Sequence, residues 1–167
     1  MTAFTVKYYT ADFLHAFFST VCGRLENGKW GSRFPHLMNE LYQGVLPVKH
    51  LAAGTAELSQ IKQELAQFAP DQVIWDIDDR SLTPPWGDNI SEDITDLSNY
   101  FVTSEGEDFL SVFAAALDKA QQRNASLKIQ TICGDYSGDR ATLSNGIPAV
   151  IQAEKIRKVL IFIYFSP

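Results

Sequence analysis

The sequence predicts an α+β fold, a single sheet with helices packed on one face. Segments rich in β-branched and aromatic residues alternate with amphipathic helical segments, but they do not form a regular strand–helix–strand repeat. Hydrophobic residues make up 46% of the chain and charged residues 20%, which is ordinary for a globular protein. Because the 167 residues include no stretch with the composition of a linker, we expect one domain over residues 1–167.

A strand followed by an amphipathic helix is expected near the N-terminus. Residues 4–9 are rich in β-forming side chains, and Thr10 can cap a helix that has Asp12 in its first turn. The turn residues Asn27 and Gly28 end this helix. Its apolar face recurs at helical spacing and comprises Phe13, Leu14, Phe17, Phe18, Val21, Cys22 and Leu25.

The middle of the chain predicts two helices and two strands. Residues 36–44 favour a short helix, and a longer helix is expected near residues 55–68, stopped by Pro70. Residues 72–77 and 98–103 are typical of strands. The apolar stripe of the longer helix comprises Leu58, Ile61, Leu65 and Phe68.

A further helix and strand are expected next. Ser104 and Glu107 match the S-x-x-E capping box, so a helix should open after them. Residues 126–133 are rich in β-forming side chains and predict a strand. The apolar face of the helix comprises Phe109, Phe113, Leu117 and Ala120.

The chain ends in an apolar segment. A polar, turn-rich connection over residues 134–146 leads to residues 148–160, whose first part is compatible with a helix. Residues 159–165 predict a buried strand, with a helical ending as the alternative, and they fall far short of the roughly 20 residues that a membrane helix needs. An exposed strand here can pair between subunits, so a homodimer stays open.

Negative charge is concentrated in one segment. The net charge is −6, from 14 basic and 20 acidic residues. Residues 76–108 hold ten acids and a single base, Arg80, so this segment carries −9 and the rest of the chain carries +3. A surface of one sign repels nucleic acid and attracts cationic partners, so we expect no nucleic-acid partner.

The N-terminal residues and the cysteines favour a cytoplasmic location. The first residues include one Lys and no apolar run of signal-peptide length, so we expect no secretion signal and no membrane partner. Cys22 and Cys133 have neither disulfide-framework nor zinc-site spacing. We expect both to be small buried side chains in a reducing compartment.

The stretch PPWGDNISEDITDLSNYF, residues 84–101, is the most unusual part of the chain. Trp86 in this stretch and Trp30 elsewhere are each followed by Gly on a predicted loop. Large aromatic side chains on polar loops are typical anchors at protein interfaces, and the alternative is that both rings fold inward. The Asp, Asn, Ser and Thr residues of the stretch also cap turns, so a rigid architectural loop is a second interpretation.

Carboxylates near this stretch raise the alternative of metal chemistry. If residues 72–77 form a strand, Asp76 and Asp78 point to one face, where paired carboxylates can bind Mg²⁺ or transfer protons. Residues 88–96 match a calcium loop only loosely, because Gly87 precedes the acids. The alternative function is a small metal-dependent hydrolase that uses Asp76, Asp78, Asp88 and Asp96.

The nucleophilic residues do not favour an enzyme. His15 and Cys22 lie on the same predicted helix, but Cys22 belongs to its apolar stripe, so a buried structural thiol is favoured over a Cys–His pair. No nucleophile-elbow, zinc-protease, Walker or Rossmann motif occurs. We therefore expect a binding module with no catalytic residues, no cofactor and no bound metal.

The blocks FFSTV, WGSRFPHLMNELYQG, VIWDIDD and PPWGDNISEDITDLSNYFVTSEGEDF resemble a known family. The chain is similar to the bacterial immunity proteins of polymorphic toxin systems, in the group named immunity protein 70. The resemblance covers residues 13–120 and does not extend beyond Gly134. It implies a non-enzymatic protein, encoded beside a toxin gene, that binds and blocks the toxin domain in the producing bacterium.

The acidic segment suits such a role, because opposite charges speed encounter and fix orientation. A basic toxin domain, such as a nuclease whose site already binds phosphate, would be a natural partner. Trp86 is the candidate anchor in this interpretation. The candidate electrostatic contacts are Asp78, Asp79, Asp88, Glu92, Asp93 and Asp96.

Overall fold

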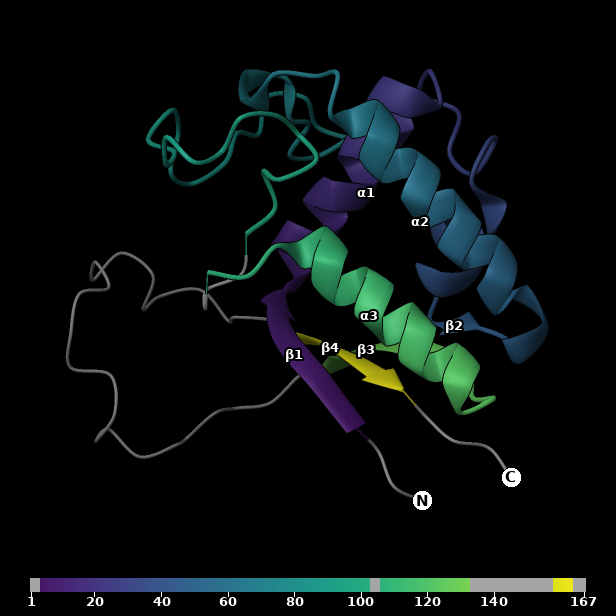
Figure 1. The fold of residues 1–167 in the computed structure, drawn as a ribbon. Coiled ribbons are helices and arrows are strands. Elements are labelled where there is room, and N and C mark those ends of the chain that lie inside the picture. Colours follow the sequence, from purple (N-terminus) through teal and green to yellow (C-terminus); the bar gives the residue numbers. More distant parts are fainter. Residues whose placement is uncertain (1–3, 103–105, 133–157, 164–167) are drawn as a thin grey trace, which may run out of the picture.

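A four-stranded antiparallel sheet forms one layer of the protein. The computed structural model describes residues 4–102, 106–132 and 158–163. The strands are arranged in the order β1-β4-β3-β2, so the last strand in sequence lies between the first and the third (Figure 1). Their bounds are β1 Phe4–Thr10, β2 Val45–Leu46, β3 Leu127–Ile132 and β4 Lys158–Ile163.

Three α-helices lie together on one side of this sheet (Figure 1). They are α1 Ala11–Leu25, α2 Leu51–Leu65 and α3 Phe109–Gln122. The α+β fold expected from the sequence is confirmed. In the described part of the chain, no helix is long and apolar enough to cross a membrane.

Helix α1 matches its prediction, and its apolar face forms the centre of the core. Phe17, Phe18 and Val21 are fully buried. Phe17 makes edge-to-face ring contacts with Phe101 and Phe109, at centroid distances of 5.4 and 5.2 Å. Such contacts add to the free energy gained from burying the rings.

Helix α2 begins four residues earlier than expected, at Leu51, and ends at Leu65. Gly54 is the fourth residue of this helix, at a position where an added Cβ would be 2.7 Å from Cδ2 of Leu46. The close packing of α2 on β2 therefore compensates for the low helix propensity of glycine. Leu58, a member of the predicted stripe, is buried as expected.

The short helix predicted over residues 36–44 is a π-helix, η1, at His36–Leu41. Its residues Leu37, Met38 and Leu41 are buried, which holds it against the core. Two short 3-10 turns complete the described helical elements, η2 at Val48–His50 and η3 at Pro70–Gln72.

The strand predicted for residues 72–77 does not form. Its backbone instead bonds to side chains of α1. The hydroxyl of Thr20 accepts from the Ile74 amide at 3.1 Å, that of Ser19 accepts from the Ile77 amide at 3.1 Å, and Arg24 donates to the Gln72 carbonyl at 2.7 Å. Because these groups satisfy the backbone polar groups, the segment needs no neighbouring strand.

The strand predicted for residues 98–103 does not form over residues 98–102, the part of it that the structure describes. Tyr100 and Phe101 are both buried, although neighbouring side chains of a strand point to opposite faces. In this region only an isolated bridge between Val102 and Asp108 occurs within the described residues. Consecutive burial of two rings therefore favours an irregular backbone over an alternating one.

Helix α3 forms as predicted, but with a different cap. Asp108 is its N-cap and accepts a hydrogen bond from the Ser111 amide at 3.3 Å. Ser104, the first residue of the expected capping box, lies outside the described residues. The helix therefore starts immediately after Asp108.

The C-terminal strand is internal to the sheet. β4 pairs with β1 on one side and with β3 on the other, so both of its backbone edges are occupied. The expectation that this strand is exposed and free to pair between subunits is therefore wrong. It was the reason for considering a homodimer, and that reason no longer holds. The polar connection over residues 134–146, Cys133 and the helix expected early in residues 148–160 lie outside the described residues, while Lys158–Ile163 is strand.

A buried carboxylate fixes the turn that follows α1. Glu26 is 1% exposed and accepts hydrogen bonds from the backbone amides of Gly31, Arg33 and Phe34, at 2.9–3.0 Å. Gly31 has a φ of +73°, a conformation that favours glycine. One side chain thus satisfies three donors of a segment that has no regular structure.

We predict that Glu26→Ala lowers the free energy of unfolding by about 2–4 kcal/mol, because backbone donors lose their acceptor. Glu26→Gln turns an NH₂ group toward the same amides and should destabilise by a smaller amount. Urea unfolding followed by circular dichroism measures both. Glu92→Ala, at an exposed acid, is the control and should stay within about 0.5 kcal/mol of wild type. An Ala variant at Glu26 as stable as this control would contradict the assigned role.

Candidate functional site

A long acidic loop, residues 73–101, is the main candidate for a functional surface. It contains no helix or strand, and it holds seven acids and one base. Figure 1 shows it in teal beside the end of α1, away from the sheet. Loops of this length that belong to a compact fold are usually functional.

An open groove of about 800 Å³ runs along the inner side of the loop. Its walls combine cationic, acidic and aromatic side chains from α1, η3 and the loop itself. Residues that line it include Arg24, Trp75, Arg80, Asp88 and Tyr100. The loop therefore presents two faces, this groove and the outer acidic surface.

Aromatic and aliphatic anchors fix the loop to the core. Ile74 and Leu97 are buried, and the Leu97 amide donates to the Phe68 carbonyl at 3.0 Å. Trp86 packs edge-to-face on Trp75, with 5.2 Å between ring centroids. The loop is thus attached at several points along its length.

Side chains of the loop also bond to its own backbone. The carboxylate of Asp79 accepts from the Ser81 amide at 3.0 Å, and that of Asp96 accepts from the Ser98 amide at 2.9 Å. The side-chain oxygen of Asn99 accepts from the Thr95 amide at 3.1 Å. These are the turn-forming bonds typical of Asp and Asn, and they support the interpretation of a rigid architectural loop.

Most of the predicted contact residues are exposed. Asp78, Asp79, Asp88, Glu92 and Asp93 are exposed, and of these Asp88 also lines the groove. Their carboxylates form an acidic face on a backbone that is held in place by the anchors and turns described above.

Asp96 differs from these five acids, because it is half-buried. Burial alone would raise its pKa, but hydrogen bonds from Ser98 and Thr95 outweigh this effect and lower the pKa. Its carboxylate stabilises the loop, so it is less available to a partner than those of its neighbours.

The two predicted tryptophan anchors differ. Trp86 is 39% exposed, although its ring N–H donates to the Tyr100 hydroxyl at 3.0 Å. Trp30 folds inward: its ring N–H donates to the Met38 carbonyl at 2.8 Å and its ring packs against Tyr42. Of the two, Trp86 is exposed and Trp30 is half-buried.

The predicted set of metal-binding carboxylates is not brought together. Asp76 and Asp78 approach His15, with ligand atoms within 4.8 Å of one another, but Asp88 and Asp96 join no such group among the described residues. The strand that was to align Asp76 and Asp78 is absent. Loop geometry therefore does not build the four-carboxylate site of the hydrolase alternative.

Asp76 instead belongs to a hydrogen-bonded network that joins the loop to α1 and η1. Its carboxylate accepts from the Asp78 amide at 2.9 Å and contacts Nε2 of His15 at 3.2 Å. Nδ1 of the same imidazole lies 2.8 Å from the Tyr42 hydroxyl. The pKa of Asp76 is lowered, mainly by the hydrogen bond from the Asp78 amide. The pKa of Tyr42 is raised, mainly by burial and further by the negative charges of Asp78 and Asp76.

Cys22 is a buried structural residue, as expected. Its side chain is 1% exposed, and burial raises the pKa of the thiol, which opposes formation of the nucleophilic thiolate. The imidazole of His15 is hydrogen-bonded to Asp76 and Tyr42. The Cys–His alternative therefore has no support from this geometry.

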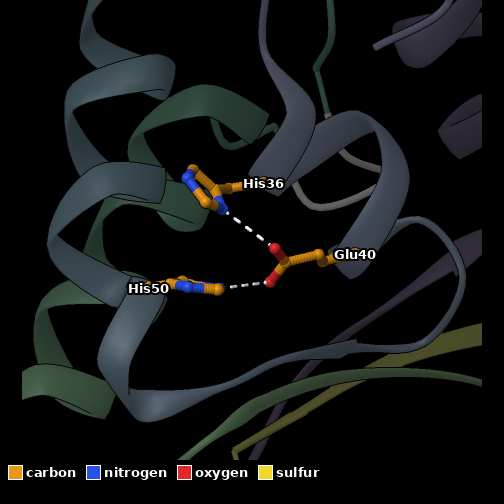
Figure 2. A group of neighbouring side chains, drawn as sticks. All are labelled: His36, Glu40 and His50. Carbon is orange, nitrogen blue, oxygen red and sulfur yellow. Dashed lines mark hydrogen bonds and ion pairs between the residues drawn. The ribbon is translucent and has the colours of Figure 1, made fainter.

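A second cluster was missed by the sequence analysis. Nδ1 of His36 lies 3.0 Å from Oε1 of Glu40, and Nδ1 of His50 lies 2.8 Å from Oε2 of the same carboxylate (Figure 2). The spacing of His36 and Glu40, four residues apart on a predicted helix, was a signal for the first contact. Nothing local in the sequence places His50 beside them.

We predict that Asp76→Asn lowers the free energy of unfolding at pH 7 by about 1 kcal/mol, because the amide cannot replace a charged acceptor. The pKa of Asp76 is lowered in the folded protein, so its stabilising effect is present above the unfolded value of about 3.9 and is lost as the pH falls through the folded value. Urea unfolding at several pH values should therefore show the difference shrinking below about pH 4. A difference that stays constant to pH 3 would contradict this.

A family model described as immunity protein 70 matches residues 1–129. The match covers more than half of the chain and includes the acidic loop, all three α-helices and the first half of β3, while β4 lies beyond it. No curated protein and no solved structure matches the chain. The match spans and extends the residues whose sequence resembled this family, and the chain therefore belongs to the immunity protein 70 family.

Proposed function

We propose that this immunity protein binds and neutralises a cognate polymorphic-toxin domain in the cytoplasm of the producing bacterium, and that it contacts the toxin through the acidic face of residues 73–101. Residues 1–167 act as one binding domain in this proposal. Inhibition results from binding and needs no catalysis by the immunity protein.

The observation that carries the proposal is an exposed acidic surface on a backbone that is already ordered. Five exposed carboxylates lie on a loop whose amides and carbonyls are bonded to α1 and to the loop's own side chains. A surface that is fixed before binding loses little conformational entropy in the complex, which favours affinity.

Charge selects the kind of partner. Seven acids and one base on residues 73–101 give this loop a charge of −6. A basic toxin surface would be attracted at long range, and the association rate would rise at low salt. Fast capture suits a protein that must block a lethal enzyme before the enzyme acts.

Trp86 supplies an apolar contact within the acidic surface. Its ring is partly exposed, and its other side rests on Trp75 and Tyr100. A rigid aromatic residue surrounded by charges is the usual arrangement of an interface hot spot with a polar rim. In this proposal Trp86 is the central anchor, and the carboxylates orient the toxin around it.

The test is a calorimetric titration of the full chain with an inactive variant of the toxin domain encoded beside its gene. We predict tight binding whose affinity falls as salt is added. Glu92→Lys or Asp93→Lys should each weaken binding by about tenfold at low salt, mainly through slower association. Both residues are exposed, so their substitution should leave the core and the folding intact.

The control is Asp118→Lys, which makes the same change of net charge on the exposed face of α3. It should change the affinity by less than about twofold, because a single distant charge is screened beyond roughly 10 Å. Tight binding that neither loop variant weakens would reject the acidic face while keeping the immunity role. Absence of binding to the neighbouring toxin would reject the role itself.

A further inference from the structure

We propose that His36, Glu40 and His50 form a binding site for a divalent transition-metal ion of the zinc type, which joins η1 to the start of α2. The site is separate from the acidic loop, and the proposal does not depend on toxin binding. Two imidazoles and one carboxylate are a donor set that Zn²⁺ prefers, and three protein ligands leave one position open.

The distances between the donor atoms fit one ion. The contacts of Glu40 with the two imidazole nitrogens are 3.0 and 2.8 Å, and one ligand atom from each of the three residues lies within 4.8 Å of the others. Ligands at the usual 2.0–2.1 Å from a tetrahedral zinc ion are about 3.3 Å apart. Small side-chain rotations would therefore bring all three donors to one ion.

The three donors come from two elements that are held independently. The amides of His36 and Leu37 donate to the carboxylate of Glu57 on α2, at 3.2 and 2.9 Å. Buried Leu37, Met38 and Leu41 fix the rest of η1, and the Met38 carbonyl accepts from Trp30. His50 immediately precedes α2. The backbone that carries the ligands is thus in place before an ion arrives, as a metal site requires.

The orientation of the rings supports the same conclusion. Both imidazoles point toward the carboxylate of Glu40, and their centroids are 4.5 Å apart (Figure 2). Without an ion, the Glu40 carboxylate accepts a hydrogen bond from Nδ1 of each imidazole. A bound ion would take the place of these protons at Nδ1, and each neutral imidazole would then carry its single ring proton on Nε2.

The site is accessible. The side chains of His36, Glu40 and His50 are 26%, 31% and 31% exposed, so an ion can enter from solvent and its open position can hold water. The π-helical form of η1 places His36 and Glu40 on one face, and π-helical turns often occur at functional sites.

The test uses the full chain, freed of metal by chelation and titrated with Zn²⁺ alone by calorimetry. We predict saturable binding of about one ion per chain. Loss of a residue that only hydrogen-bonds to a metal ligand typically lowers metal affinity about 10–100-fold. His50→Gln and Glu40→Gln remove a ligand itself, so each should lower the affinity for Zn²⁺ by more than this. Zn²⁺ should raise the melting temperature of the wild-type protein and of neither variant.

The matched control is His15→Gln, because His15, Asp76 and Asp78 form the other group of neighbouring donors in the described chain. This variant should bind Zn²⁺ with unchanged affinity. Absence of saturable binding to the wild-type protein would overturn the proposal and leave Glu40 as a hydrogen-bond acceptor only. Binding that is lost in His15→Gln and kept in the other two variants would also overturn it. Circular dichroism shows whether each variant is folded. If His50→Gln does not fold, Glu40→Gln decides the test.

Discussion

The position of the acidic loop depends on hydrogen bonds between buried hydroxyl groups of α1 and the backbone that begins the loop. The Thr20 hydroxyl accepts a hydrogen bond from the Ile74 amide. The same hydroxyl donates toward the carbonyls of Ala16 and Ile74, with oxygen–oxygen distances of 2.8 and 3.1 Å. Ser19 accepts from the Ile77 amide. A buried backbone group without a partner would cost about 1–3 kcal/mol, so these contacts replace the ladder that a strand would need.

Helix α1 therefore organises the protein with two kinds of residue. Its apolar face forms the centre of the core, while its polar side chains bond to segments that have no regular structure. The buried polar residues of the described chain are Ser19 and Thr20 of α1 and Glu26, which directly follows the helix, and each bonds to the backbone of such a segment. An irregular surface can thus be as well fixed as a sheet, which is what a preformed binding surface requires.

The sequence predicted the features that depend on local periodicity and composition. The 3.6-residue repeat located α1 and α3, and the cluster of acids located the charged loop. The two segments wrongly predicted as strands are rich in β-forming residues, but tertiary structure overrides this preference. Hydrogen bonds to α1 hold the first in an irregular conformation, and burial of both Tyr100 and Phe101 does so for the second. The meeting of His50 with η1 could not be predicted, because it depends on how residues 42–50 fold back.

The most direct test of this account is amide hydrogen exchange of the free protein. We predict that the amides of Ile74 and Ile77 exchange nearly as slowly as those inside α1, and that Thr20→Val speeds exchange at Ile74 by tenfold or more while α1 keeps its protection. If Ile74 and Ile77 of the wild-type protein exchange as fast as the exposed loop residue Ser91, the loop is not held by α1. The acidic surface would then not be preformed, and the account would be contradicted.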